Sequence, residues 1–205
     1  MSQKEDKYNK ILDALQTLLE DKGINTVTMK EIAQTAGIGK STIYYYFPNK
    51  DAILEALVKR DYEKPIETAR HLEGKKDISP FTRMAMIFEA CRNSSAAFLR
   101  HGPSEQTTSA SDRALLHQKY MKYLIHELKP TLGEIIWQAT QSGEAKFSDP
   151  HALAEIVLIV LTVELDNSLL STSQEEVDKS IRALIELLEK GTENPSGSLN
   201  FLSTW

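Results

Sequence analysis

The sequence of 205 residues has little of several features that define whole protein classes. Cys91 is its only cysteine, which excludes a disulfide within the chain and a zinc site built on several thiolates. The longest apolar stretch runs from Ile156 to Leu161, far short of the about 18 residues that a membrane-spanning helix needs. The first seven residues are polar and lack the apolar core of a secretion signal. These absences predict a cytoplasmic protein with no membrane partner.

The sequence also lacks an excess of positive charge. The formal net charge is −5, and residues 1–64 hold ten basic and ten acidic residues, so the acidic excess lies in residues 65–205. A net-negative protein is not an obvious partner for nucleic acid. The first third is at least not repelled by phosphate, and a few well-placed cations matter more than the total. Charge alone therefore does not predict DNA binding.

The dominant pattern is helical, and no convincing strand pairs are present. Apolar residues recur at spacings of three and four, as in the run that includes Ile11, Leu15 and Leu19. The pattern predicts an all-α fold with a first helix ended by Gly23, a helix that Pro65 kinks or breaks, and a long helix bent at Pro130. The predicted helices cover about residues 11–22, 29–36, 40–47, 50–73, 81–99, 112–141, 150–170 and 173–190.

Four helix starts carry clear capping signals. Thr28 and Ser173 each precede a glutamate by three residues, which is the capping-box pattern. Asn49 and Asp149 are good N-cap residues for the helices that follow them. The segment Thr192–Trp205 beyond the last helix is rich in Gly, Pro and Ser, and we expect other parts of the chain to hold it in place.

The segment from Thr28 to Lys50 predicts a helix-turn-helix. Two short helices are joined by Gly37-Ile38-Gly39, and the second helix of such a motif enters the major groove of DNA. A lysine at residue 40 can donate to guanine, while hydroxyl side chains suit phosphates and either kind of base partner. Ile43 and Phe47 are expected to point back into a small core.

The stretch from about Ile11 to Leu57 resembles the DNA-binding domain of the TetR/AcrR family of bacterial transcriptional regulators. The resemblance is carried by a specific set of residues: Thr28, Ile32-Ala33, Ala36-Gly37-Ile38, Lys40-Ser41-Thr42-Ile43-Tyr44, Tyr46-Phe47, Asn49-Lys50-Asp51 and Leu54. It covers about a quarter of the chain, and the departures are small because Tyr45 and Pro48 fall where the family varies.

The resemblance implies an all-α homodimer that binds a palindromic DNA operator and represses transcription. It also implies that a small-molecule effector releases this repressor from the operator. It implies base-facing roles for Lys40, Ser41 and Tyr44, and mainly backbone-facing roles for Thr28, Thr42, Tyr45, Tyr46 and Lys50. The domains expected are a DNA-binding domain over residues 1–50, an effector-binding and dimerisation domain over residues 51–191, and a tail over residues 192–205. No cofactor or metal is implied.

Two further sets of residues follow from the predicted helices. Bulky side chains of the second domain are core candidates first, and those expected to line an effector pocket are Met84, Phe88, Cys91, Tyr120, Tyr123 and Trp137. The last two helices match the family's dimerising pair, and the expected interface residues are Leu153, Ile156, Val157, Val160, Leu161, Ile181, Leu184, Ile185 and Leu188.

The alternative functions have weaker support in the sequence. Gly39-Lys40-Ser41 hints at a phosphate-binding loop, but Gln34 stands where that motif needs its first glycine. The five histidines are scattered without the spacing of a metal site, and no Gly-x-Ser-x-Gly turn presents a nucleophile. An enzyme is therefore disfavoured. A DNA-binding module that senses no ligand remains an alternative, and a cavity in the second domain would argue against it.

Overall fold

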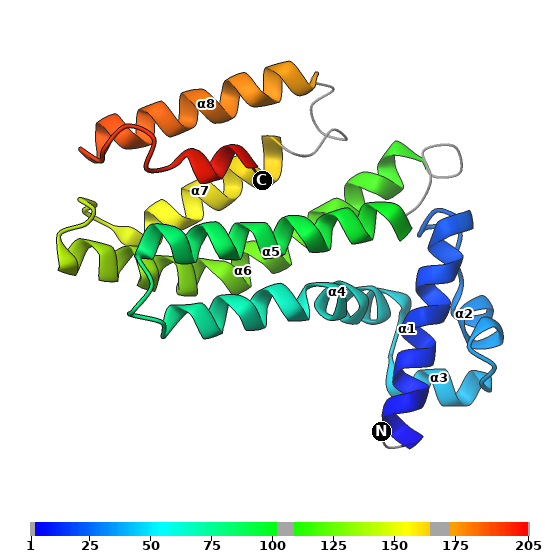
Figure 1. Cartoon of the computed structure of the whole chain (residues 1–205). Coiled ribbons are helices and arrows are strands. Elements are labelled where there is room, and N and C mark those ends of the chain that lie inside the picture. The colour runs from blue at the N-terminus through cyan, green and yellow to red at the C-terminus, as the bar shows by residue number, and fades with distance from the viewer. Residues whose placement is uncertain (1–2, 102–108, 165–172, 205) are drawn as a thin grey trace. The chain divides into compact units, whose positions relative to one another are not determined.

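The computed structural model describes residues 3–101, 109–164 and 173–204, and every regular element in these ranges is helical. The all-α prediction is therefore confirmed. In chain order the helices are α1 (Gln3–Asp21), α2 (Met29–Thr35), α3 (Lys40–Tyr46), α4 (Lys50–Glu73), α5 (Pro80–His101), α6 (Ala110–Ser142), α7 (Pro150–Glu164), α8 (Gln174–Gly191) and the 3-10 helix η1 (Asn200–Thr204) (Figure 1). Among the described residues, no helix combines the length and the hydropathy needed to cross a bilayer.

The chain forms two compact units, and neither is a continuous stretch of sequence. The first contains Met1–Asp61 and Ala96–Tyr120, and the second contains Tyr62–Ser95 and Met121–Trp205. The chain passes from one unit to the other inside α4, inside α5 and inside α6.

In the first unit α2 packs against α1 and α3 packs against α2 around a small apolar core (Figure 1). Ile11, Leu15, Ile32, Ile43 and Ile53 are almost fully buried there, as the spacing of apolar residues predicts. The capping box before α2 is present, because Thr28 Oγ1 accepts from Glu31 N at 3.3 Å while Thr28 N donates to Glu31 Oε2 at 2.9 Å. Asn49 Oδ1 accepts from Ala52 N at 2.9 Å at the start of α4. The local signals therefore fix where the short helices begin.

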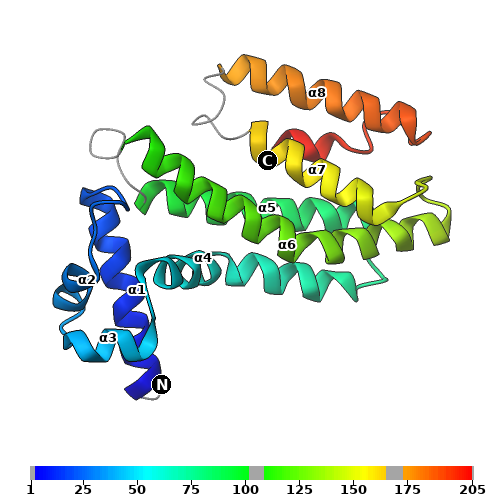
Figure 2. The same ribbon diagram turned by 180° about the vertical axis from the view of Figure 1, so that it is seen from behind.

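The second unit contains the end of α4, most of α5 and α6, and the C-terminal elements. Helix α8 packs against both α7 and η1, and Figure 2 shows these three elements together. Asp149 Oδ1 accepts from Ala152 N at 3.0 Å, and Ser173 and Glu176 form the expected capping box, so both predicted helix starts are confirmed. Arg83 is buried and ties α5 to its neighbours by donating to Glu73 O at 3.0 Å and to Gln138 Oε1 at 2.7 Å.

Two helices contain a proline in their interior without being broken. Pro65 is buried inside α4, where its flanking apolar residues Tyr62, Ile66 and Ala69 are also buried. Burial of this apolar face offsets the loss of one backbone hydrogen bond. Pro130 likewise lies inside the continuous helix α6.

Candidate nucleic-acid interface and effector pocket

Helix α3 presents polar and aromatic side chains to the surface of the first unit. Lys40 and Ser41 are exposed at its start, and Tyr45, with 73% exposed, is the most exposed of the large apolar and aromatic side chains that the structure describes. Tyr44 is also exposed, while Thr42 and Tyr46 are half-buried. Ile43 and Phe47 point into the core instead, as predicted. The surface of α3 therefore carries the amine and hydroxyl groups that DNA contacts use.

The exposed tyrosines are ordered by their neighbours. The rings of Tyr45 and Tyr46 meet edge to face with centroids 5.3 Å apart. Lys4 Nζ, near the start of α1, lies 6.0 Å from the centroid of the Tyr45 ring, within the range of a cation–π contact. Phe47 packs against Tyr8 of α1 at 5.0 Å between centroids. These contacts fix α3 against α1 and leave the outer edges of its tyrosines free to meet a ligand.

Thr28 and Lys50, the two predicted phosphate-binding residues outside α3, already have partners within the chain. The Thr28 hydroxyl serves the capping box of α2 and donates to Glu31 Oε2 at 2.8 Å. Hydrogen bonds from Lys22 and from Thr28 lower the pKa of Glu31 to about 2, so this carboxylate stays ionised. Lys22 Nζ lies 2.7 Å from Glu31 and offsets its negative charge beside the proposed DNA surface.

Lys50 connects the start of α4 to the turn between α1 and α2. Its Nζ donates to the carbonyl oxygen of Ile24 and to that of Val27, the latter at 2.7 Å. Burial lowers the pKa of Lys50, while the negative charges of Asp112 and Glu31 oppose that shift. The amine thus has a structural role that the sequence pattern alone does not reveal.

The start of α6 meets the same turn through Asp112. Asp112 Oδ1 accepts from Asn25 N at 2.9 Å, and Ser109 Oγ donates to Asp112 Oδ2 at 2.6 Å. The hydrogen bond from Ser109, the backbone N–H of Asn25 and the positive charge of Lys50 lower the pKa of this buried carboxyl. A Cβ atom on Gly23 would lie 2.8 Å from Asp112 Cγ, so only glycine leaves room for the carboxylate. Residues Gly23, Asn25, Lys50, Ser109 and Asp112 are called the α1–α2 junction below.

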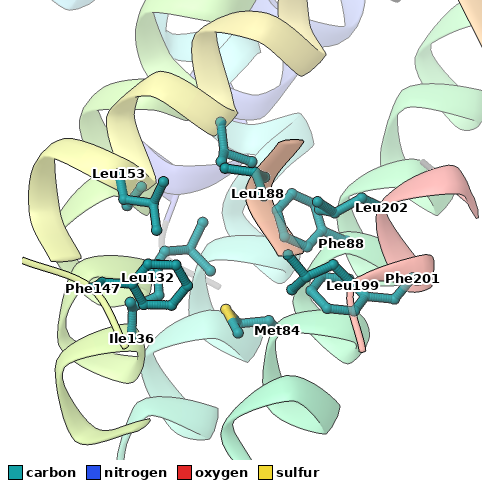
Figure 3. A pocket seen from close by; sticks show the side chains of 12 residues that line it. Met84, Phe88, Leu132, Ile136, Phe147, Leu153, Leu188, Leu199, Phe201 and Leu202 are labelled. Carbon is teal, nitrogen blue, oxygen red and sulfur yellow. The ribbon is translucent and has the colours of Figure 1, made fainter. Parts of the chain in front are cut away.

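The second unit contains a pocket with an entirely apolar lining (Figure 3). Its volume is about 440 Å³, with the open mouth included. Side chains come from α5, α6, the loop before α7, α7, α8 and the C-terminal segment: Met84, Phe88, Leu132, Ile136, Phe147, Leu153, Ala154, Val157, Leu188, Leu199, Phe201 and Leu202.

The pocket contains two of the six side chains expected to line it. Met84 and Phe88 are part of its wall. Cys91 is fully buried elsewhere in α5, and burial raises the pKa of its thiol to about 12, which removes the thiolate that redox chemistry requires. Tyr120 belongs to the first unit, where its hydroxyl donates to Asp61 Oδ2 at 3.0 Å. Tyr123 is half-buried and Trp137 is exposed, and neither belongs to the pocket wall.

The residues expected at a dimer interface divide into four groups. Ile156 is 54% exposed on α7, and Leu187 of α8, which the sequence analysis did not select, is 69% exposed. Ile159 is exposed on α7 as well. Val160 and Leu184 are half-buried, and Leu161, Ile181 and Ile185 lie in the core of the second unit. Leu153, Val157 and Leu188 line the pocket. The exposed apolar side chains of α7 and α8 are called the α7–α8 face below.

Comparison with known proteins assigns the family. A model for bacterial regulatory proteins of the tetR family matches residues 11–57, the segment that holds α2, α3 and most of α1. The chain belongs to the TetR family of transcriptional regulators. It is a DNA-binding regulator, and regulators of this family are not enzymes.

Similarity to relatives extends beyond the matched segment. The chain is 25% identical over 195 residues to the fatty acid metabolism regulator protein of Bacillus subtilis, a match that covers 95% of this chain and 100% of that protein. It is 28% identical over 126 residues to the regulator EthR of Mycobacterium tuberculosis, which covers 58% of each chain. In fold it is similar to SmeT, the repressor of a multidrug efflux pump of Stenotrophomonas maltophilia, with a TM-score of 0.60 at 16% identity over 94% of each chain.

Proposed function

We propose that this TetR-family regulator is a homodimer that represses transcription from a palindromic operator and leaves it when an apolar effector binds. The observation that carries the DNA part is the exposed surface of α3, where Lys40, Ser41 and Tyr44 would face bases. Thr28, Thr42, Tyr45, Tyr46 and Lys50 would face the DNA backbone. One such surface is too small for strong specificity, whereas two copies on one dimer can read half-sites about 34–36 Å apart.

The α7–α8 face supports the homodimer. Exposed apolar side chains such as Ile156 and Leu187 are common at interfaces, because contact with a second copy removes them from water. A protein that binds chromosomal DNA must share a compartment with it, so the proposal places this regulator in the cytoplasm.

The pocket supports the response to an effector. Its volume falls in the range of small-molecule sites, about 300–1,000 Å³. The alternative of a module that senses nothing does not need such a cavity. The Bacillus subtilis relative is named a regulator of fatty acid metabolism, and an alkyl chain is one ligand that an apolar lining accepts.

Coupling between effector and operator would pass along α4 and α6. Both helices begin at the α1–α2 junction and continue into the second unit. A shift of either helix on effector binding would therefore alter the junction and the reach of the two α3 helices. Such coupling is reciprocal and typically worth about 1–3 kcal/mol.

A DNA-binding comparison tests the role of α3. An operator is first selected from random duplexes, and binding is then measured by fluorescence anisotropy for the native protein, Lys40→Ala and Lys59→Ala. Lys59 is an exposed cation of α4 and serves as the matched control. We expect Lys40→Ala to lose about 1–3 kcal/mol on the selected operator and to relax the base preference at one position. Equal losses for the two variants on every sequence would contradict base reading by Lys40.

A further inference from the structure

The C-terminal segment beyond α8 is fixed to the second unit by one buried carboxylate. Glu189 lies near the end of α8 with only 7% of its surface exposed. Its Oε2 accepts from Gly197 N at 3.0 Å, and its Oε1 accepts from Leu199 N at 2.9 Å. Its backbone oxygen accepts from Asn194 N at 2.9 Å. One residue of α8 thus holds three backbone N–H groups of the segment that follows.

The backbone of this segment turns back through two left-handed residues. Glu193 has a φ of 53° and Gly197 a φ of 86°, both in the region that favours glycine. Glu193 also forms an ion pair with Lys146, which lies in the loop before α7. The reversal brings η1 back against α8.

The reversed segment supplies one wall of the apolar pocket. Leu199, Phe201 and Leu202 belong to its lining, and Leu199 and Leu202 are buried. The ring of Phe201 packs against that of Phe88 of α5 with centroids 5.8 Å apart. Figure 3 shows these three side chains beside Phe88, on the side of the pocket opposite Phe147 and Leu153. The segment is thus positioned by Glu189 and closes the pocket with apolar groups.

We infer that residues 197–204 form part of the effector site and that Glu189 is the residue that positions them. The inference rests on the proposed effector role of the pocket and adds the ligand class. All twelve lining residues are apolar, so a hydroxyl or a charge placed inside would have no partner. The part of the ligand inside the pocket is an alkyl or aryl hydrocarbon group, and its polar groups remain at the mouth.

Binding of an uncharged fluorescent probe tests whether residues 197–204 form a wall of the effector site. The dissociation constant of N-phenyl-1-naphthylamine is measured for the native protein, Glu189→Gln, a chain ended after Ser196, and Glu186→Gln. Glu186 is an exposed glutamate of α8 that pairs with Lys190 and is the matched control. A glutamine at 189 can accept only one of the two N–H groups, so we expect binding about tenfold weaker, and at least as weak in the shortened chain.

The result of the control and the folding of each variant complete this test. We expect Glu186→Gln to bind the probe as the native protein does. Circular dichroism establishes that Glu189→Gln is folded, so its result stands even where the shortened chain unfolds. Unchanged or tighter probe binding by folded Glu189→Gln would overturn the inference that the segment is a wall of the site.

A pair of displacing alcohols tests the ligand class. Decanol and a decanediol with a hydroxyl at each end have the same length, but the diol must bury one hydroxyl to enter the pocket. We expect decanol to displace the probe at a concentration at least about tenfold lower. Equal displacement would show a polar partner inside the site and overturn the hydrocarbon assignment.

Operator binding separates this inference from the function on which it rests. Decanol is added to the complex of native protein and operator, and release of DNA is expected. Probe binding that depends on Glu189, together with DNA affinity that no apolar compound changes, would overturn the effector role and leave the wall intact. Release of DNA by decanol without any effect of Glu189→Gln would overturn the wall and leave the effector role intact.

Discussion

Lys50 illustrates how one side chain can carry two roles at the residue scale. The resemblance to the family implies a contact with the DNA backbone, while its Nζ is bonded to the carbonyl groups of Ile24 and Val27. Removal of this amine therefore affects the first unit before DNA is present. Its role as a phosphate contact stays a prediction, and the structural role has its own test.

Lys50→Met is expected to destabilise the protein without DNA. The variant keeps the apolar stem but leaves two carbonyl oxygens without their charged donor, a loss of about 1.5–3 kcal/mol in the free energy of unfolding. Urea unfolding followed by circular dichroism measures it, with Lys59→Met as the control because Lys59 is exposed. If both variants unfold at the native urea concentration, the contacts of Lys50 contribute nothing to stability.

Asp112 predicts a stability difference that depends on pH. Its folded-state pKa lies below the usual 3.8, first because Ser109 donates to it and then because of Asn25 and Lys50. A carboxyl with a lowered pKa stabilises the fold above its unfolded pKa, and this contribution is lost as pH falls through the folded pKa. We expect the difference in the free energy of unfolding between the native protein and Asp112→Asn to have its largest value at about pH 6 and to decrease below about pH 3.8. A difference in unfolding free energy that stays constant over this pH range would contradict a lowered pKa of Asp112 in the folded protein.

At the scale of elements, the α1–α2 junction joins the turn after α1 to the starts of α4 and α6, which are distant from it in sequence. The sequence pattern predicts that Gly23 follows the end of the first helix, and α1 does end just before it, at Asp21, but Gly23 does not have the positive φ of a helix-ending glycine. The reason for glycine is the approach of Asp112 from α6. Local sequence could not predict this, because the partner lies 89 positions further along the chain.

A double-mutant cycle measures the interaction between residue 23 and Asp112. Gly23→Ala places a Cβ against the Asp112 carboxylate and is expected to cost about 1–3 kcal/mol of unfolding free energy. In an Asp112→Ala background the space is free, so the same substitution should cost much less, and the two changes should couple by at least about 0.5 kcal/mol. Gly191→Ala is the control, since a Cβ there would meet no atom within 4 Å. Additive losses would show that the two residues do not interact.

Sequence reasoning predicted elements better than sites for a physical reason. The helices and caps depend on neighbours within about four residues, so Thr28, Asn49, Asp149 and Ser173 are read correctly. The pocket wall depends on which distant segments meet. Met84 and Phe88 were selected as bulky residues of an amphipathic helix, but Leu199 and Leu202 lie in a segment whose Gly- and Pro-rich composition suggests only a loop.

At the scale of the whole molecule, the α7–α8 face predicts a dimer. One substitution in this face should dissociate it. Ile156→Glu places a charge in the proposed dimer interface, where burial without a partner is costly. We expect sedimentation equilibrium to give the monomer mass for this variant and twice that mass for the native protein. Operator affinity should fall at least about tenfold, since one reading surface replaces two. Met86→Glu, which alters an exposed apolar residue of α5, is expected to remain dimeric.

The discontinuity of the first unit has a consequence for hybrid regulators. Residues 96–120 belong to the unit that holds α3, although residues 62–95 of the second unit precede them in the chain. A chimera could take its first 61 residues from this protein and the remainder from a relative. Gly23 and Asn25 would then lie against the relative's side chain in the place of Asp112. Transplanting operator recognition between relatives therefore requires two segments to be exchanged together, and the second of them begins in the middle of a helix.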